Sequence, residues 1–222
     1  TGLGRGYGSD PNGWFGPARV LVRPQFDPAE TAVAQVRRLG HRAEDVTDIV
    51  LTHFDADHAG GLADFPAARV HVTAAENRVS STPRGLVQRG RYLPALRAHG
   101  PRIVEHSPER GESWRGFARA VELTDISPDV VLLALPGHSA GHAAIAVRHQ
   151  APGDDHWVLH VGDTFYHRGQ INGPGNAPRP LRLSERLIAD DWSAVRRNHA
   201  RLTELWRDGG PELLLVNAHD PA

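Results

Sequence analysis

The sequence has 222 residues, of which 40% are hydrophobic and 23% charged, and its 25 basic and 26 acidic side chains give a formal net charge of -1. This composition is that of a globular chain and excludes a disordered or collagen-like one. The balanced charge gives no overall field for nucleic acid or an acidic membrane, and no apolar stretch approaches the roughly 20 residues that span a bilayer. Cysteine is absent and every basic residue is arginine, which excludes thiolate ligands, cysteine nucleophiles and lysine Schiff bases.

The first half of the chain predicts a loop, two helices and two strands. Residues 1–17 are rich in glycine and are expected to form a loop. Asp27 is a helix N-cap, followed by Pro28 at the first helical position, and Gly40 ends that helix. The helical spacing of its apolar residues predicts a buried face of Ala32, Val33, Val36 and Leu39. The other elements expected in this half are strands over 48–52 and 69–73 and a helix over 84–99.

The second half predicts mostly strands, which are expected over 130–135, 143–147, 157–161 and 212–217. Residues 164–183 hold several glycines and prolines and predict a long loop that covers a site. An amphipathic helix over 190–207 is expected to place Trp192, Val195, His199, Leu202 and Trp206 on one side. No internal linker is evident, so we expect one domain over residues 1–222.

The 14 histidines are not scattered evenly. Four apolar runs end in a residue that can bind a metal ion: His53, His138, Asp163 and His219. Strands that end at one edge of a sheet bring such residues together, as ligand sites of α/β folds do. One histidine after one strand is commonly structural, but four such endings predict a shared site.

The densest group of these residues is the segment from His53 to His58, which also contains Asp55 and Asp57. Two carboxylates and two imidazoles folded inward would repel one another when bare and buried, and a divalent cation removes that repulsion. A solvated acidic turn is the alternative for this segment alone. The other strand endings favour a metal site.

The motifs His53-x-Asp55-x-Asp57-His58, Pro136-Gly-His138, Gly162-Asp163 and Ala218-His219 resemble the metal-binding motifs of the metallo-β-lactamase superfamily. The resemblance covers nearly the whole chain, in order. It implies an α/β fold, an αββα sandwich with a two-metal site on one edge. Carried over residue by residue, it implies a first metal ion bound by His53, Asp55 and His138. A second would be bound by Asp57, His58 and His219, with Asp163 bridging the two.

Two positions depart from the family pattern. Thr1-Gly2 resembles the end of the turn that follows the first two strands of the family, so we expect those strands to precede Thr1. Asp55 stands where the usual motif has histidine, and flavodiiron members of the superfamily carry glutamate there. A carboxylate is a harder ligand than imidazole. We therefore expect two divalent ions, zinc first, with manganese or iron as alternatives because of Asp55.

Tyr166 follows Asp163 by three residues, and the segment Asp163-Thr-Phe-Tyr166 resembles that of quorum-quenching N-acyl homoserine lactone lactonases. There, a tyrosine at this offset points into the site and helps hold the substrate carbonyl or the leaving oxygen. The alternative is a tyrosine that packs at a strand end. His142, His160 and His167 are expected to support the ligands rather than to bind the metal.

The resulting hypothesis is a metal-dependent hydrolase that cleaves a lactone or another ester with a bridging hydroxide, where Asp57 receives the proton of the leaving oxygen and Tyr166 assists. The alternative is an iron-dependent oxidoreductase or dioxygenase of the same fold that uses His53, Asp55 and His138, a set of two histidines and one carboxylate. A metal-binding protein without catalysis is the third hypothesis. We expect a small-molecule substrate, no nucleic-acid or membrane partner and a cytoplasmic location, and the sequence leaves the oligomeric state open.

Overall fold

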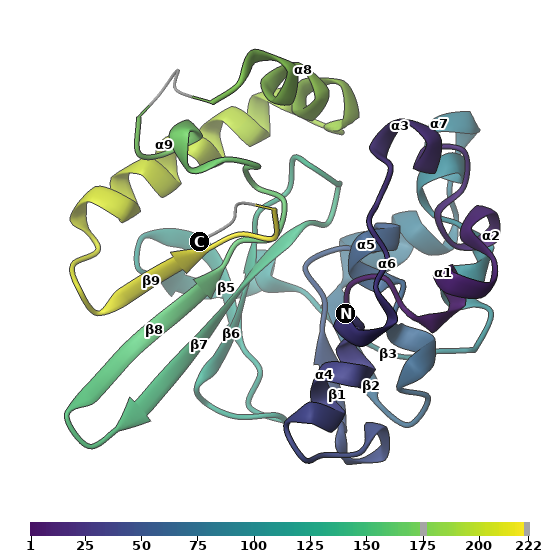
Figure 1. Ribbon diagram of the computed structural model, residues 1–222. Helices are drawn as coiled ribbons and strands as arrows, with labels where there is room; N and C mark the ends of the chain where they lie inside the picture. Colours follow the sequence, from purple (N-terminus) through teal and green to yellow (C-terminus); the bar gives the residue numbers. More distant parts are fainter. Residues whose placement is uncertain (174–176, 220–222) are drawn as a thin grey trace. The chain divides into compact units, whose positions relative to one another are not determined.

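A computed structural model describes residues 1–173 and 177–219, and the chain divides into two compact units, Thr1–Glu105 and His106–Ala222 (Figure 1). We call them the first unit and the second unit. The prediction of one domain over residues 1–222 stays a prediction.

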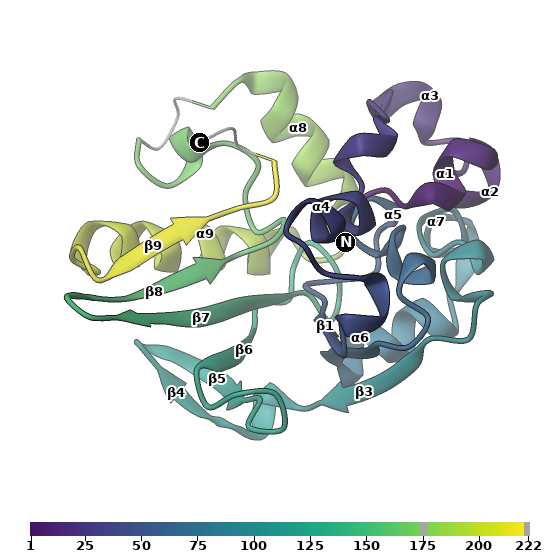
Figure 2. The same cartoon turned by 60° about the horizontal axis from the view of Figure 1, so that its bottom comes forward.

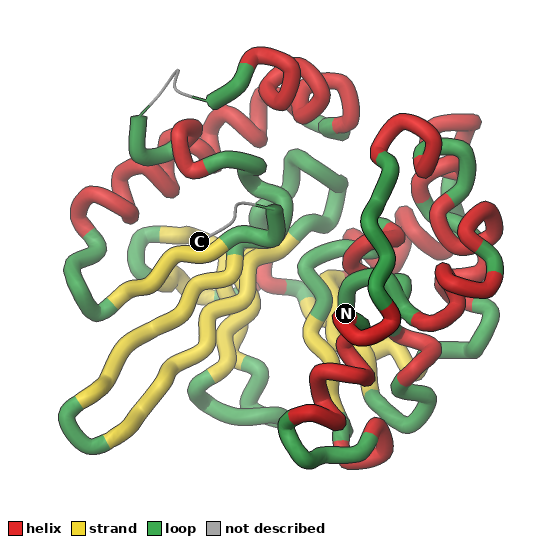
Figure 3. The backbone as a smooth tube through the Cα atoms, in the orientation of Figure 1, coloured by secondary structure: helices red, strands yellow, loops and turns green. Residues whose placement is uncertain are grey.

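The first unit combines short helices with a three-stranded sheet in the order β1-β2-β3 (Figure 3). The strands are β1 (Asp48–Val50), β2 (Arg69–Thr73) and β3 (Arg102–His106). The α-helices are α1 (Arg5–Ser9), α2 (Pro11–Phe15), α3 (Arg19–Val22), α4 (Ala32–Arg38), α5 (Ala56–Ala59), α6 (Ala74–Ser81) and α7 (Gly85–Arg91). Short 3-10 helices lie at Pro28–Glu30, Ala43–Asp45, Leu62–Asp64 and Pro94–Arg97.

Strands β1 and β2 are parallel, and a partly buried polar contact fixes one end of the pair. Asp48 on β1 accepts hydrogen bonds from Arg69 Nε at 2.7 Å and from His71 Nε2 at 2.8 Å, and Asp48 is the register partner of Arg69. Burial raises the pKa of Asp48, but the hydrogen bonds from Arg69, His71 and Thr47 outweigh it and lower that pKa to about 2. This contact lies at the start of β1, and the other end of the strand leads to His53.

Residues 1–17 do not form the predicted loop. Helices α1 and α2 occupy this segment, because Asp10 caps α2 by accepting a hydrogen bond from Gly13 N at 2.9 Å. Tyr7 and Phe15 are buried with ring centroids 6.0 Å apart, so aromatic burial outweighs the low helix propensity of the glycines.

The helix predicted after Asp27 is divided. Asp27 caps only the 3-10 turn Pro28–Glu30, and α4 starts anew at Ala32 and ends at Arg38. Val33 is buried as predicted, whereas Leu39 lies beyond the helix and is 76% exposed. The helix predicted over 84–99 is likewise divided into α7 and the 3-10 helix Pro94–Arg97, because Pro94 cannot continue an α-helix.

The second unit contains a six-stranded sheet in the order β4-β5-β6-β7-β8-β9. The strands are β4 (Glu112–Trp114), β5 (Phe117–Glu122), β6 (Val130–Ala134), β7 (Ala143–Ala151), β8 (Asp154–His160) and β9 (Leu213–Val216). Strands β7 and β8 form a long hairpin, longer than the sequence predicted (Figure 2). Helices α8 (Arg179–Ile188) and α9 (Trp192–Asp208) complete the unit, with 3-10 helices at Pro108–Arg110 and Arg168–Gln170.

The direction of the strands decides where the site residues emerge. Strand β7 is antiparallel to both β6 and β8, and β9 is parallel to β8. Strands β6, β8 and β9 therefore run in one direction and end at the same edge of the sheet. His138, Asp163 and His219 follow these three ends, as predicted, whereas His53 follows β1 of the other sheet.

Helix α9 packs on the sheet of the second unit, where Leu202 and Leu205 join the core of β5 to β8. Trp206 was predicted on this face but is 52% exposed, and Leu205 takes that place. The long loop predicted over 164–183 is wrong from Arg179 onward, because α8 begins there with Pro180 in its first turn. Residues 174–176 of that range lie outside the described residues.

Within residues 1–173 and 177–219, the helices are all too short or too polar to cross a bilayer.

The Asp48 contact predicts a pH-dependent stability. The carboxylate of Asp48 titrates near pH 2 when folded and near its ordinary pKa of 3.8 when unfolded, so its contribution is present above about pH 4 and declines as the pH falls toward 2. Asp48→Asn should therefore lower the free energy of unfolding by about 1 kcal/mol at pH 7, with a smaller difference at pH 3. Urea titrations at the two pH values measure this, with exposed Glu212→Gln as the control. An equal loss at pH 7 and pH 3 would contradict the account.

Candidate metal centre

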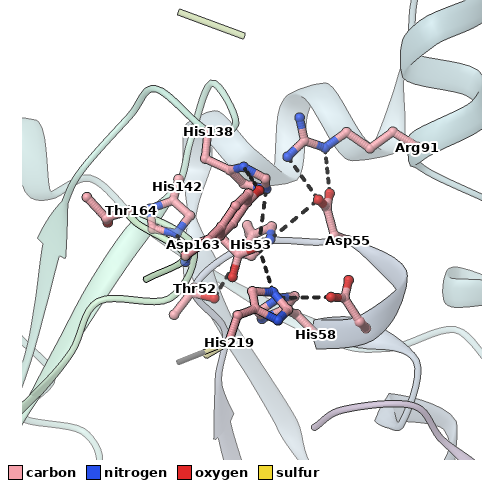
Figure 4. Close-up of polar contacts among 12 residues, drawn as sticks. Thr52, His53, Asp55, His58, Arg91, His138, His142, Asp163, Thr164 and His219 are labelled. Carbon is pink, nitrogen blue, oxygen red and sulfur yellow. Dashed lines mark hydrogen bonds and ion pairs between the residues drawn. The ribbon is translucent and has the colours of Figure 1, made fainter. Parts of the chain in front are cut away.

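The segment after β1 brings His53 and Asp55 together (Figure 4). His53 is fully buried, and its Nδ1 lies 2.9 Å from the hydroxyl oxygen of Thr52. Its other ring nitrogen, Nε2, lies 3.5 Å from Asp55 Oδ2. When Nδ1–H donates to Thr52, Nε2 carries the lone pair, which is the tautomer that a metal-binding imidazole needs.

Asp57 and His58 form a second pair in the same segment. Both lie in α5, where His58 Nε2 is 3.5 Å from Asp57 Oδ2. The rings of His53 and His58 are buried with their centroids 4.0 Å apart. Two imidazolium ions at that separation would repel each other strongly in a medium of low dielectric constant, so the ring pair favours neutral imidazoles.

A buried glutamate that the sequence analysis did not identify holds this segment in place. Glu76 accepts a hydrogen bond from the backbone N–H of Phe54 at 3.0 Å, between His53 and Asp55. Thr73 caps α6 by accepting a hydrogen bond from Glu76 N at 3.1 Å, which fixes the start of that helix. The pattern Thr73-x-x-Glu76 before a helix is the signal that could have revealed it.

Asp55 is also bound by Arg91, at the end of α7. The guanidinium donates from Nε to Oδ1 at 2.5 Å and from Nη2 to Oδ2 at 2.9 Å (Figure 4). Burial lowers the pKa of Arg91, but the charge and hydrogen bonds of Asp55 outweigh it and raise that pKa above its ordinary value. Arg91 lies 36 residues after Asp55, and no local pattern in the sequence reveals it.

In the second unit, Asp163 lies between two histidines. Its Oδ2 is 3.1 Å from His219 Nε2 and 3.7 Å from His138 Nε2. Gly137, before His138, has a φ of +149°, and a Cβ at this position would lie 2.8 Å from Val195 N. The tight turn after β6 therefore needs glycine to direct His138 to the sheet edge.

The hydroxyl of Tyr166 lies 3.1 Å from His138 Nδ1. His138 directs its other nitrogen, Nε2, toward Asp163. If Nε2 binds a metal, Nδ1 carries the proton and donates it to the Tyr166 oxygen, and the hydroxyl proton of Tyr166 remains to be donated elsewhere. Tyr166 can therefore pack against His138 and still use its hydroxyl to bind substrate, which are the two roles considered for it.

His142 supports Asp163, as the sequence analysis expected. Its Nδ1 lies 3.2 Å from Leu135 O, and its Nε2 accepts a hydrogen bond from Asp163 N at 3.0 Å. His160 and His167 also contact the backbone: the Nδ1 of each accepts a hydrogen bond, from Gly162 N and Gly169 N respectively. These three histidines order the turns around the site.

A second buried glutamate missed by the sequence analysis supports the Asp163–Tyr166 turn. Glu185 on α8 is 1% exposed and binds His199 and Gln170. Gln170 in turn accepts a hydrogen bond from Tyr166 N at 2.8 Å, and His199 Nε2 lies 2.8 Å from Thr164 O. The network connects α8 and α9 to the turn that presents Tyr166.

The donors in both units are imidazole nitrogens and carboxylate oxygens. The chemistry of this donor set fits a borderline divalent cation such as Zn²⁺, Mn²⁺ or Fe²⁺. Buried carboxylates and neutral imidazoles are also the groups that a cation stabilises when water is excluded. The residues present are therefore those that a divalent metal requires.

Comparison with known proteins identifies the family. The family profile described as "Metallo-beta-lactamase superfamily" matches residues 24–205. The chain belongs to this superfamily. The resemblance inferred from the motifs is confirmed, and with it the α/β fold class of the metallo-β-lactamase type and divalent metal binding.

Two curated relatives show how this chain compares with named members. A protein named "probable metallo-hydrolase" of Mycobacterium tuberculosis is 49% identical over 221 residues, which are 100% of this chain and 69% of the relative. An N-acyl homoserine lactonase of Azorhizobium caulinodans is 29% identical over 216 residues, 96% of this chain and 73% of that protein.

A solved structure of AidC, described as a dizinc quorum-quenching lactonase in complex with a product, matches with a TM-score of 0.57 and 15% identity. The match covers 86% of this chain and 62% of AidC, so the chain spans less than two thirds of that protein. At this identity the similarity concerns the fold.

Metal removal should destabilise the protein. A cation present at about 1,000 times its dissociation constant stabilises the folded state by about 4 kcal/mol, so exhaustive chelation should lower the melting temperature by about 10 °C. Calorimetry before and after chelation measures the shift, and added Zn²⁺ should reverse it. An unchanged melting temperature after verified metal removal would count against a bound metal.

Proposed function

We propose that this chain is a hydrolase that uses two metal ions to cleave a lactone or another ester. His53, Asp55 and His138 would bind the first ion, and Asp57, His58 and His219 the second, with Asp163 shared by both. A small organic molecule is the proposed substrate. The family membership of the chain supports a metallo-hydrolase, and the geometry within each unit supports the finer assignment.

The spacing of the donor atoms is the observation that carries the proposal. Two ligand atoms that each lie about 2.1 Å from one tetrahedral ion are about 3.4 Å apart. The pairs His53–Asp55 and His58–Asp57 in the first unit are both separated by 3.5 Å. Asp163 Oδ2 lies 3.1 Å and 3.7 Å from its two histidines, as expected of an oxygen that two ions share. The exposed pair His149–Asp154 has the same 3.5 Å separation, so the burial of His53, His58 and Asp163, together with the repeated spacing, distinguishes these pairs.

Divalent ions, when bound, supply water of lowered pKa and polarise the carbonyl oxygen of an ester. The protein supplies the rest. The Tyr166 oxygen would accept a hydrogen bond from His138 Nδ1–H, and its own hydroxyl would donate a hydrogen bond to an oxygen of the substrate, where negative charge develops. Asp57 is 34% exposed, so its carboxylate can take up a proton and pass it to the leaving oxygen.

The names of two similar proteins suggest the substrate class. The relative from Azorhizobium caulinodans and AidC are both described as lactonases. A lactone also suits the proposed chemistry, because hydrolysis leaves the alcohol and the acid in one molecule that the site can release in a single step. N-acyl homoserine lactones are therefore the first compounds to test.

An iron-dependent oxidoreductase is the second candidate, and the pairing of His53 with the Asp55 carboxylate is the observation that favours it. That function needs one redox-active ion. The pair formed by Asp57 and His58 is then left without a function, so we favour the hydrolase.

The decisive experiment combines elemental analysis with turnover. Protein purified without added metal should contain two equivalents of zinc or manganese, and should release acid from a panel of lactones and aryl esters only when metal is present. One equivalent of iron with oxygen consumption would favour the oxidoreductase. Protein that holds two metal ions but hydrolyses no lactone or ester would refute the proposed substrate class.

The Tyr166→Phe variant tests the role of the tyrosine. If its hydroxyl stabilises charge that develops in the transition state, kcat should fall up to about tenfold, and KM should change less. Fold and metal content should stay intact. Steady-state kinetics on the best substrate measure this, with Tyr7→Phe, which removes the hydroxyl of another tyrosine of low exposure, as the control. An unchanged kcat would leave Tyr166 only as a packing partner of His138.

A further inference from the structure

The contact between Asp55 and Arg91 neutralises the charge at position 55, which the sequence motif does not reveal. Asp55 stands where the family pattern has a neutral histidine. Its negative charge is matched by Arg91, which binds both carboxylate oxygens through two parallel hydrogen bonds. Carboxylate and guanidinium together carry no net charge, and in this they resemble a neutral imidazole.

The arginine leaves Asp55 able to bind a metal. Each carboxylate oxygen has two lone pairs, and the two hydrogen bonds from Arg91 use one on each oxygen. Oδ2 still lies 3.5 Å from His53 Nε2, which is the separation expected of two ligands of one ion. Arg91 and a metal ion can therefore contact the same carboxylate.

Both ends of the contact are fixed by the core of the first unit. Phe54, next to Asp55, and Tyr92, next to Arg91, belong to one hydrophobic cluster. The two charged side chains are only 18% and 14% exposed, so each needs the other where water is scarce. An arginine that packs this firmly can orient the carboxylate as well as neutralise it.

We propose that Asp55 and Arg91 act as one neutral metal-binding unit, in which Asp55 is the ligand of the first ion and Arg91 is the positioning residue that cancels its charge. The proposal rests on the proposed function. The sequence alone indicates a hard carboxylate donor with a full negative charge at position 55. In the proposed unit the charge of this oxygen donor is reduced. The first ion therefore keeps the polarising power that it would have with a histidine ligand.

A double-mutant cycle tests the proposal through metal affinity. Asp55→His restores the family residue but leaves the Arg91 cation beside a dication, so the first Zn²⁺ should bind at least tenfold more weakly than in the wild type. The double variant Asp55→His, Arg91→Gln removes that cation and should recover most of the affinity. Competition with a chromophoric chelator measures the dissociation constants of both ions, and apo melting temperatures measure folding separately.

The single variant Arg91→Gln provides an independent measurement if Asp55→His does not fold. It leaves Asp55 as an uncompensated carboxylate, so affinity should shift severalfold from Zn²⁺ toward the harder Mn²⁺. Arg89→Gln is the matched control, because Arg89 lies exposed on the same helix and carries the same charge. Its metal affinities should equal those of the wild type.

The outcomes separate the two proposals. Equal Zn²⁺ affinity in Asp55→His and the double variant, or an unchanged preference between Zn²⁺ and Mn²⁺ in Arg91→Gln, would make the contact a purely structural ion pair and overturn the inference alone. Wild-type protein that binds neither metal would overturn the proposed function as well.

Discussion

A carboxylate that is removed from water needs positive charge close by, and this requirement governs how the strand ends of the protein are built. Asp163 is 5% exposed, and its carboxylate faces two imidazoles. Asp55 meets the same requirement through the guanidinium of Arg91. A divalent cation is the partner that carboxylates and neutral imidazoles can share, and the surrounding structure holds these groups ready for one.

Support for the site comes from buried polar groups that do not bind metal themselves. Glu76 holds the backbone beside His53, and Glu185 acts through Gln170 on the turn that carries Tyr166. His142 accepts the N–H of Asp163. Because ligand positions must be accurate to a fraction of an ångström, such contacts decide whether a set of suitable residues becomes a site.

The strand-end residues could be predicted from the sequence, because apolar residues at the ends of β6, β8 and β9 are followed closely by His138, Asp163 and His219. The family motifs extended that prediction to the fold class. Helices α1 and α2 could not be predicted, because aromatic burial of Tyr7 and Phe15 overrides the glycine-rich composition. Contacts between residues far apart in the chain, such as Asp55 with Arg91, leave no local pattern. The neutralisation of Asp55 by Arg91 was therefore the feature least accessible from the sequence.

The central proposal is that the predicted ligands bind two metal ions and that Asp163 is shared by both. Anomalous X-ray scattering from crystals of the zinc-loaded protein tests it most directly. The account predicts two metal peaks, with Asp163 in contact with both. A single peak, or two peaks without Asp163 among their ligands, would contradict it.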